Sequence, residues 1–188
     1  MHRDIEKVLI DRDRIAARVR ELGEAISRDV HALLAPDVAR GQDEHLVIIP
    51  ILTGAMIFVA DLVRELPLKM CIELVGVSSY PGKSIESKGV SIRHELPRTL
   101  AGRHVLIVDD ILDSGQTLEV VTRLVREQRP ASVRTCVLLR KPGKARPDFN
   151  PDYLGFDIPD EFVVGYGLDY DGFYRNYPQV ATLKEEAR

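Results

Sequence analysis

A pair of adjacent carboxylates, Asp109 and Asp110, directly follows a short run of branched apolar residues, Val105 to Val108. Such an uninterrupted run predicts a strand that is covered on both faces, as in a parallel sheet. Because open parallel sheets bind ligands at the carboxyl ends of their strands, the two carboxylates stand where a ligand is expected. They could accept hydrogen bonds from hydroxyl groups or contact a divalent cation.

The loop after the carboxylates has the composition of a phosphate site. Ser114, Gly115, Gln116 and Thr117 lead into a segment, 117–128, whose apolar residues recur at helical spacing. The N-terminus of a helix presents unpaired backbone N–H groups, and a glycine lets an anion approach them closely. A phosphate beside two carboxylates requires a ligand with hydroxyl groups between them, or a cation that screens the charge. A sugar phosphate with vicinal hydroxyls meets this requirement.

An acid pair at the end of a strand has other interpretations. It can cap a helix or bind a metal, as in receiver-like and phosphatase-like sites, although the Asp-x-Asp-x-Thr arrangement usual in the latter is absent here. A second candidate anion site, Thr53-Gly54-Ala55, lies between an apolar run, 46–52, and a helical pattern, 55–66, which stops before Pro67. One ligand with phosphates at both ends would bridge the two loops.

The remaining patterns alternate between helix and strand. Residues 14–34 show helical spacing and are expected to form a helix that ends before Pro36, while 69–77 and 133–139 are typical of strands. This alternation predicts an α/β fold with a parallel central sheet flanked by helices. With 188 residues, 45% of them apolar, the chain can bury one core as a single domain.

Residues 105–118 resemble the phosphoribosyl-diphosphate binding motif of the type I phosphoribosyltransferases. Further along, Lys141-Pro142, the segment 151–170 and Phe173-Tyr174-Arg175 are similar to the purine-binding hood of the hypoxanthine-guanine phosphoribosyltransferases. The resemblance runs from about Leu46 to Pro178. It implies the type I phosphoribosyltransferase fold over 1–188, with a hood formed mainly by 141–188 and the N-terminus and a flexible lid over about 80–98.

The activity that this resemblance implies is purine salvage. A purine nitrogen of hypoxanthine or guanine would displace pyrophosphate from phosphoribosyl diphosphate, giving IMP or GMP. Asp113 would be the catalytic proton acceptor, and Asp169, Asp109 and Asp110 would contact Mg²⁺. The residues expected to bind substrate are Thr53, Gly54, Ser79, Tyr80, Asp109, Asp110, Ile111, Ser114, Gly115, Gln116, Thr117, Lys141, Phe162, Val163 and Arg175.

The purine requires a flat apolar slot and a donor for its 6-oxo group. Phe162 and Ile111 would cover the two faces of the base, and Lys141 would donate to the oxygen. The main-chain carbonyls of Val163 and Asp169 would be available to a 2-amino group. Arg175 matches an arginine that contacts pyrophosphate in the resembled family. Thr53 departs from the family pattern, in which Lys or Arg is frequent, so that only the backbone contact to pyrophosphate is expected there.

The segment from 80 to 98 interrupts the regular alternation with closely spaced Pro, Gly, Ser and Lys residues. A polar loop of this length is usually functional or disordered. By resemblance it is the lid over the reacting centre, with Ser79 and Tyr80 at its base. The alternative is a surface hairpin with Val90 and Ile92 on one side.

Charge and cysteine content restrict the function further. A net charge of −3, spread along the chain, predicts neither a nucleic-acid partner nor a membrane partner. No apolar stretch approaches the roughly 20 residues of a membrane span, and a cytoplasmic location is expected. Cys71 and Cys136 are interpreted as small buried hydrophobic residues, and the five histidines lack the spacing of zinc ligands.

Two functions from different classes remain open. Lys141, Phe162 and the aromatic-rich C-terminal segment favour the enzyme. The alternative is a regulatory protein of the same fold that binds phosphoribosyl diphosphate or a nucleotide without catalysis. A homodimer or homotetramer is expected from the resemblance and from apolar positions of the first helix that we predict to be exposed.

Overall fold

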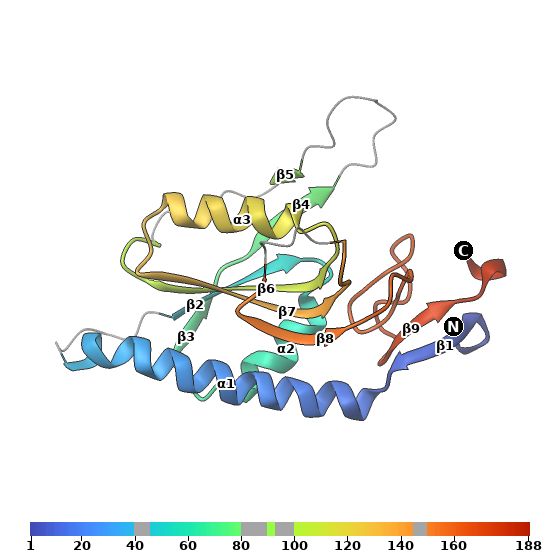
Figure 1. Cartoon of the computed structure of the whole chain (residues 1–188), viewed down its shortest axis with the longest axis horizontal. Helices are drawn as coiled ribbons and strands as arrows, with labels where there is room; N and C mark the ends of the chain where they lie inside the picture. The colour runs from blue at the N-terminus through green and yellow to red at the C-terminus, as the bar shows by residue number, and fades with distance from the viewer. Residues whose placement is uncertain (40–45, 80–89, 93–99, 145–149) are drawn as a thin grey trace.

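The computed structural model describes residues 1–39, 46–79, 90–92, 100–144 and 150–188 (Figure 1). Its centre is a seven-stranded sheet in the order β5-β4-β2-β6-β7-β8, in which β3 also pairs with β2. Among these strands every pairing is parallel except that of β4 with β5. The strands are β2 (Leu46–Leu52), β3 (Met70–Ile72), β4 (Val75–Ser79), β5 (Val90–Ile92), β6 (His104–Leu112), β7 (Ser132–Arg140) and β8 (Tyr153–Asp157).

Helices cover both faces of this sheet, which confirms the predicted α/β fold (Figure 1). Ile48 and Leu106 pack in the core beneath α1 and α2, whereas their neighbours Val47 and Ile107 pack beneath α3. Because successive side chains of a strand point to opposite faces, a strand buried on both faces must be apolar throughout. The helices are α1 (Arg12–Ala39), α2 (Met56–Leu62) and α3 (Gln116–Glu127).

The two ends of the chain meet in a separate two-stranded sheet. Strand β1 (Ile5–Ile10) pairs antiparallel with β9 (Val180–Leu183), and both termini lie at this side of the molecule (Figure 1). Short 3₁₀ turns flank the pair, η1 (His2–Asp4) and η3 (Glu185–Ala187), while η2 (Val63–Glu65) extends α2. The N-terminal strand is therefore held against the C-terminal segment rather than against the central sheet.

Three predicted boundaries are wrong. Helix α1 continues past Pro36 to Ala39, since a proline removes one hydrogen bond and need not end a helix. The strand expected over 69–77 is interrupted at residues 73–74, which separate β3 from β4, although both pieces pair with β2 in one register and the Glu73 N–H still donates to the carbonyl of Ile48. Strand β6 is longer than 105–108 and includes both carboxylates.

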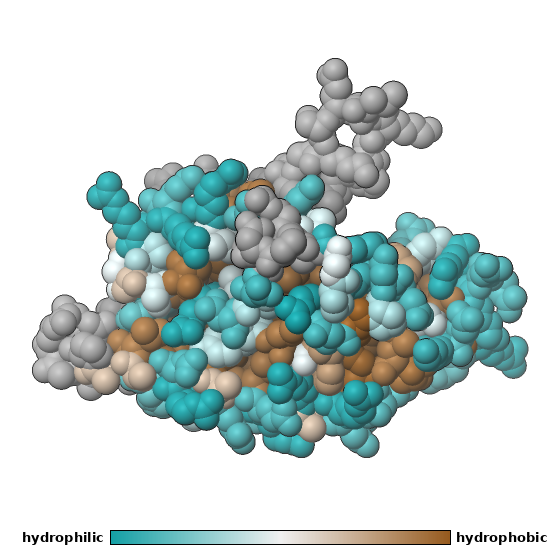
Figure 2. Space-filling view, viewed as in Figure 1, coloured by the Kyte–Doolittle hydropathy of each residue, from teal (hydrophilic) through white to brown (hydrophobic). Residues whose placement is uncertain are grey.

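Two predictions of exposure also fail. Cys136 is buried as expected, but Cys71 is exposed, because β3 is a three-residue strand paired only with β2 among the described strands. The apolar stripe of α1, which includes Ile15, Val19 and Ile26, packs into the core, so these side chains are not exposed as the prediction required. Correspondingly, the outward side of α1 is largely hydrophilic (Figure 2). None of the described helices is long and apolar enough to cross a membrane.

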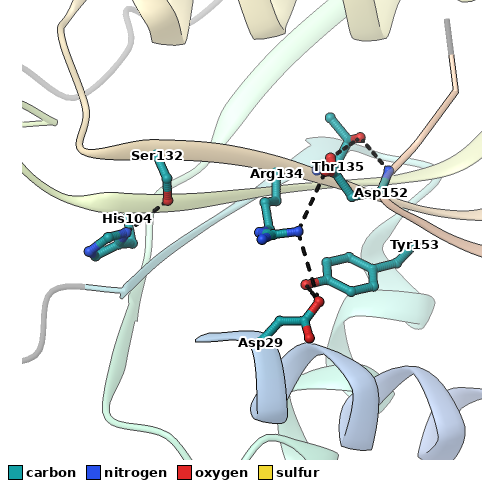
Figure 3. A network of polar contacts seen from close by, with 7 residues as sticks. All are labelled: Asp29, His104, Ser132, Arg134, Thr135, Asp152 and Tyr153. Carbon is teal, nitrogen blue, oxygen red and sulfur yellow. Dashed lines mark hydrogen bonds and ion pairs between the residues drawn. The ribbon is translucent and has the colours of Figure 1, made fainter. Parts of the chain in front are cut away.

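A polar network joins α1 to the amino ends of β7 and β8, at the edge of the sheet opposite the acid pair (Figure 3). The Tyr153 hydroxyl donates to Asp29 Oδ2 at 2.9 Å, and Arg134 Nη1 lies 3.8 Å from the same oxygen and 3.7 Å from Asp152 Oδ1. The backbone N–H of Thr135 donates to Asp152 Oδ2 at 2.8 Å. Burial, followed by the bond to Asp29, raises the pKa of the Tyr153 phenol. The network therefore has a structural role far from the carboxyl ends of the strands.

Candidate active site

A cleft of about 250 Å³ lies at the carboxyl end of β6, beside the start of α3. Its walls include backbone and side chains from the ends of β2 and β6 and from the loop between β6 and α3. This is the edge of a parallel sheet at which ligands bind. The predicted site residues that line the cleft are Gly54, Asp109, Asp110, Ile111, Asp113, Ser114, Gly115 and Thr117.

Strand pairing fixes the backbone of the two carboxylates. Asp109 pairs with Val137 of β7, and Ile111 pairs with Leu139. The Asp110 N–H donates to Asp109 Oδ1 at 3.0 Å, and the Ile111 N–H donates to Asp110 Oδ1 at 2.9 Å. Each carboxylate thus accepts a backbone hydrogen bond through its Oδ1, and this bond helps to fix its orientation.

The acid pair is electrostatically destabilised in the ligand-free protein. Asp109 is only 6% exposed, and its burial, followed by the neighbouring charge of Asp110, raises its pKa well above the ordinary value. Burial also raises the pKa of Asp110, although its hydrogen bonds with the Asp109 side chain and the backbone, and then the nearby charge of Arg175, oppose this shift. A ligand that brings hydroxyl donors or positive charge to this pair would relieve the repulsion. The vicinal hydroxyls of a ribose are suited to this.

The first turn of α3 borders the cleft. Gly115 caps the helix with a φ of 80°, in the left-handed region that favours glycine, and its carbonyl accepts the N–H of Glu119 at 2.9 Å. Ser114 and Thr117 line the cleft, whereas Gln116, the first residue of the helix, is exposed. The N–H groups of a first helical turn have no partner within the helix. An anion in the cleft could accept them, as the sequence predicted.

The loop after β2 packs closely against the acid pair. A Cβ at Gly54 would overlap Asp110 Oδ2, and a Cβ at Gly167, which has a φ of +105°, would overlap the carbonyl oxygen of Gly54. Both positions therefore require glycine for close approach. Thr53 is exposed in the turn that follows the cis Leu52–Thr53 peptide, and it is not among the residues lining the cleft.

The residues expected to hold the purine come from three separate segments. Lys141, at the end of β7, is buried, and its Nζ lies 3.5 Å from Asp113 Oδ2. The Phe162 ring is 46% exposed and packs edge-on against Tyr170, with ring centroids 5.6 Å apart. Val163, the next residue, is buried. The exposed ring provides a surface for stacking, and the buried ammonium provides a donor for a polar edge.

Asp169 and Arg175 form an ion pair in the C-terminal turns. Arg175 Nη2 lies 2.6 Å from Asp169 Oδ1, and its Nη1 donates to the Gly167 carbonyl at 2.6 Å. The second oxygen of Asp169 accepts the Gly172 N–H at 2.8 Å. Because both oxygens already have protein partners, Asp169 is better placed to meet a hydrated cation through water than to bind it directly.

Two predicted site residues, Ser79 and Tyr80, lie partly or wholly outside the described part of the chain. Ser79 ends β4 and pairs with Val90 of β5, but its side chain is outside the description, and Tyr80 lies outside the described residues altogether. Of the segment 80–98, the structure describes Val90–Ile92, which forms an antiparallel pair with β4. The described part is a hairpin strand, and the rest of the predicted lid lies outside the described residues.

Sequence reasoning missed several polar residues that lie around the predicted site residues. Lys144 Nζ lies 2.7 Å from Asp160 Oδ1 and 3.7 Å from Asp113 Oδ1. The Tyr166 hydroxyl donates to Asp61 Oδ2 at 2.6 Å and so ties the turn that carries Gly167 to α2. Lys144 stands only three residues after Lys141 in the sequence, and this proximity was the one local indication that it lies near the predicted site. The other contacts join residues far apart in the sequence.

The donors around the cleft fit a magnesium ion that substrate helps to hold. The described residues contain no cluster of three or more metal-ligating side chains. The carboxylate oxygens of Asp109 and Asp110 are hard ligands, and Mg²⁺ is usually bound by one or two carboxylates together with substrate phosphates and water. The site therefore fits Mg²⁺ that arrives with a diphosphate.

Comparisons with known proteins agree with this geometry. Residues 14–171 match the family model of the phosphoribosyl transferase domain. The chain is 45% identical to the hypoxanthine-guanine phosphoribosyltransferase of Mycobacterium tuberculosis over 180 residues, which is 96% of this chain and 87% of the relative. Identity to the enzyme of the same name from Bacillus subtilis is 38%, covering 98% of this chain and 96% of the relative.

Solved structures give the same result. A hypoxanthine phosphoribosyltransferase from Staphylococcus aureus superposes with a TM-score of 0.86 at 36% identity, covering 99% of this chain and 95% of that chain. A mutant of the hypoxanthine phosphoribosyltransferase from Trypanosoma cruzi, in a ternary complex with substrates, superposes with a TM-score of 0.85 at 34% identity, covering 98% of both chains.

The acid pair and the loop and helix start that follow it, residues 109–118, form what we call the phosphate corner. Its place on this sheet, together with the family match, defines a phosphoribosyltransferase domain, and the chain belongs to that family. Within the family, its similarity to named relatives extends over nearly the whole chain. The chain therefore belongs to the hypoxanthine-guanine phosphoribosyltransferases.

Proposed function

We propose that this protein acts in purine salvage by transferring the 5-phosphoribosyl group of phosphoribosyl diphosphate to hypoxanthine, guanine or both. The observation that carries this proposal is the place of Asp113. Its carboxylate lines the cleft that ends at the phosphate corner and also lies 3.5 Å from the buried ammonium of Lys141. A single group thus connects the sugar-phosphate end of the site to the purine end.

The phosphoribosyl group would be held by three sets of contacts. The 5-phosphate accepts hydrogen bonds from the first turn of α3 and from Ser114 and Thr117. The ribose hydroxyls donate to Asp109 and Asp110, which relieves the repulsion within that buried pair. The pyrophosphate lies against the backbone of Thr53 and Gly54, with positive charge from Arg175.

The purine would lie between Ile111 and the exposed ring of Phe162. Lys141 donates to its 6-oxo group, and a donor at this position favours 6-oxopurines over adenine, whose amino group cannot accept the bond. The carbonyl of Val163 is available to the 2-amino group of guanine. Hypoxanthine lacks that amino group and loses only this contact.

In the reaction, a bond forms between a purine nitrogen and C1 of the ribose while the bond from C1 to the pyrophosphate oxygen breaks. The bonding electrons leave with pyrophosphate, and the N7 proton of the base passes to Asp113. The sugar becomes oxocarbenium-like as negative charge grows on the leaving group, so donors fixed around that group stabilise the transition state. A positioned base such as Asp113 contributes about 10²–10⁴ to the rate.

Magnesium is part of the proposal. Asp109 and Asp110 would hold it together with the substrate, and Asp169 would contact it mostly through water. When bound with the diphosphate, Mg²⁺ supplies charge neutralisation for the departing pyrophosphate.

The proposal extends to the organisation of the whole chain. We propose one domain over 1–188, in which 141–188 and the N-terminus form a hood and about 80–98 form a lid. The pairing of β1 with β9 supports a hood that includes both ends of the chain. We further propose a homodimer or homotetramer, supported by the family resemblance, that acts in the cytoplasm without nucleic-acid or membrane partners.

The regulatory alternative is disfavoured. A regulator that only binds phosphoribosyl diphosphate needs the phosphate corner and the acid pair, but it does not need a buried lysine beside an acid at the purine end. The relatives in the comparisons also carry enzyme names. These observations favour catalysis over binding alone.

The test is a pyrophosphate-release assay with Mg²⁺, phosphoribosyl diphosphate and each of hypoxanthine, guanine, xanthine and adenine in turn. We expect release with hypoxanthine or guanine and little or none with adenine, and the response to xanthine defines the limit of selectivity at the 2-position. Binding of phosphoribosyl diphosphate without release for every base would contradict the proposal and support the regulator.

A further inference from the structure

Four charged side chains meet at the purine end of the site: Asp113, Lys141, Lys144 and Asp160. Lys141 Nζ lies 3.5 Å from Asp113 Oδ2 and 3.5 Å from Asp160 Oδ1. Lys144 Nζ lies 2.7 Å from Asp160 Oδ1 and 3.7 Å from Asp113 Oδ1. Each lysine therefore contacts both acids, and the formal charges of the cluster cancel.

The two lysines differ in their need for partners. Lys141 is buried, and a buried ammonium is unstable unless nearby anions compensate it. Lys144 is 44% exposed and is stabilised by water as well. The acids therefore matter most to Lys141, the residue that would donate to the purine.

The distances show how the acids are shared. The 2.7 Å contact between Lys144 and Asp160 has the length of a charge-assisted hydrogen bond. Both contacts of Lys141 are longer than an ordinary N–H···O bond of roughly 2.7–3.2 Å. The Lys141 ammonium thus lies between two carboxylates without a short bond to either. This leaves an Asp113 oxygen able to accept a proton and a Lys141 N–H able to turn to a ligand.

We propose that Asp160, anchored by Lys144, is a positioning residue that holds the Lys141 ammonium away from Asp113 and so keeps both groups available to the purine. This inference rests on the proposed function. Asp160 precedes Phe162 by two residues, so the same contact also fixes the segment that would cover one face of the base. One ion-pair cluster thereby positions both the Lys141 ammonium at the edge of the purine and the segment that carries Phe162 at its face.

The two residues should act differently when removed. Without the charge of Asp160, Asp113 is the remaining anion beside Lys141, and the two would form a short ion pair. That pair would occupy the carboxylate oxygen that is to accept the purine proton. Without Lys144, Asp160 would instead turn to Lys141 and compete with the 6-oxo group of the base for its N–H groups.

The experiment compares Asp160→Asn and Lys144→Met with Glu161→Gln. Glu161 is the adjacent acid and makes no ion pair in the described part of the chain, so its substitution removes the same charge outside the cluster. Steady-state kinetics of pyrophosphate release are measured with hypoxanthine at saturating phosphoribosyl diphosphate and Mg²⁺, so that kcat and the KM for hypoxanthine are obtained separately.

For Asp160→Asn we expect kcat to fall about tenfold, a fraction of the full value of a general base. Asp160→Glu should restore most of the rate.

For Lys144→Met we expect a KM for hypoxanthine raised about tenfold with a smaller change in kcat, as for a weakened hydrogen bond to a charged group. Glu161→Gln should match the wild type.

The proposal is wrong if both cluster variants match Glu161→Gln in kcat and in KM while the wild type is active. It is also wrong if their whole deficit is explained by the fraction unfolded in a thermal melt. Should Asp160→Asn fail to fold, Lys144→Met decides the matter through its KM. A wild type that releases no pyrophosphate with any base overturns the proposed function, and this inference with it, which distinguishes the two failures.

Discussion

The phosphate corner and the purine end of the site are built in different ways. The corner is made by consecutive residues, 109–118, at the junction of β6 and α3, and its donors are backbone N–H groups and hydroxyls. The purine end combines Asp113, Lys141, Asp160 and Phe162, which come from three segments and are held by ion pairs and ring contacts.

This difference separates what the fold fixes from what side chains must fix. Backbone donors at the corner are placed by strand pairing and by the helix, so few single substitutions could remove them. The charged groups at the purine end hold one another in place, and removing one leaves another buried without compensation. We therefore expect the purine end to be the more sensitive of the two to single side-chain changes.

The largest expected effect is at Asp113. Asp113→Asn should lower kcat by about 10²–10⁴, because the amide cannot accept the base proton, while the fold remains intact. The measurement is pyrophosphate release with hypoxanthine, with circular dichroism as the control for folding. An unchanged kcat would remove Asp113 from the mechanism.

A smaller effect is expected at the loop that supports the corner. Gly54→Ala would force Asp110 away from residue 54, since the new Cβ would overlap Asp110 Oδ2. A displacement of reacting groups by about 1 Å can cost 10²-fold, and we expect a loss of that order in kcat/KM for phosphoribosyl diphosphate. Gly102→Ala is the control, because a Cβ there meets nothing within 4 Å although its φ of +73° adds strain, and the residue precedes β6 at its amino end. Equal losses in both variants would refute the contact.

The acid pair should show a trade between stability and activity. Burial raises the pKa of Asp109, so at neutral pH the cost of ionising this buried carboxyl destabilises the ligand-free fold. Asp109→Asn should raise the Tm by about 2–4 °C, the shift for 1 kcal/mol in a chain of this size, and lower kcat/KM. The gain should vanish as the pH falls below about 3.9, where the unfolded carboxyl is also protonated. A lowered Tm at pH 7 would contradict this account.

The smallest effect on activity is expected in the polar network at the amino ends of β7 and β8, away from the site. Asp152→Ala removes the acceptor for Thr135 and an ion-pair partner of Arg134. It should cost about 1–3 kcal/mol of folding free energy, as for a donor left unsatisfied, and leave kcat/KM per folded molecule unchanged. Chemical denaturation and steady-state kinetics on the same sample test this. A selective loss of activity would show that the network reaches the site.

The same contrast explains how far the sequence could be interpreted. The alternation of apolar runs predicted the sheet and its flanking helices, and the residues after Val108 predicted the phosphate corner, because both depend on neighbours in the chain. The Lys144 to Asp160 contact and the bond between Tyr166 and Asp61 join distant residues, and no local pattern indicates them.

The errors have the same origin. The exposure of Cys71 depends on how many strands pair with β3, and the length of β6 depends on β7 extending beside it. Pairing with another strand is not visible in composition or periodicity. Helix α1 continues past Pro36 although a proline inside a helix removes a hydrogen bond, an outcome that the local rule for helix ends does not anticipate.

The central claim is that the corner after β6 binds the phosphate of a nucleotide while its neighbouring acids hold the sugar. A crystal structure of the protein with IMP tests it most directly. We predict the 5-phosphate on Ser114 and Thr117 at the start of α3, the ribose hydroxyls on Asp109 and Asp110, and the base against Phe162. An empty corner, or one whose Ser114 and Thr117 do not contact the phosphate, would contradict the account.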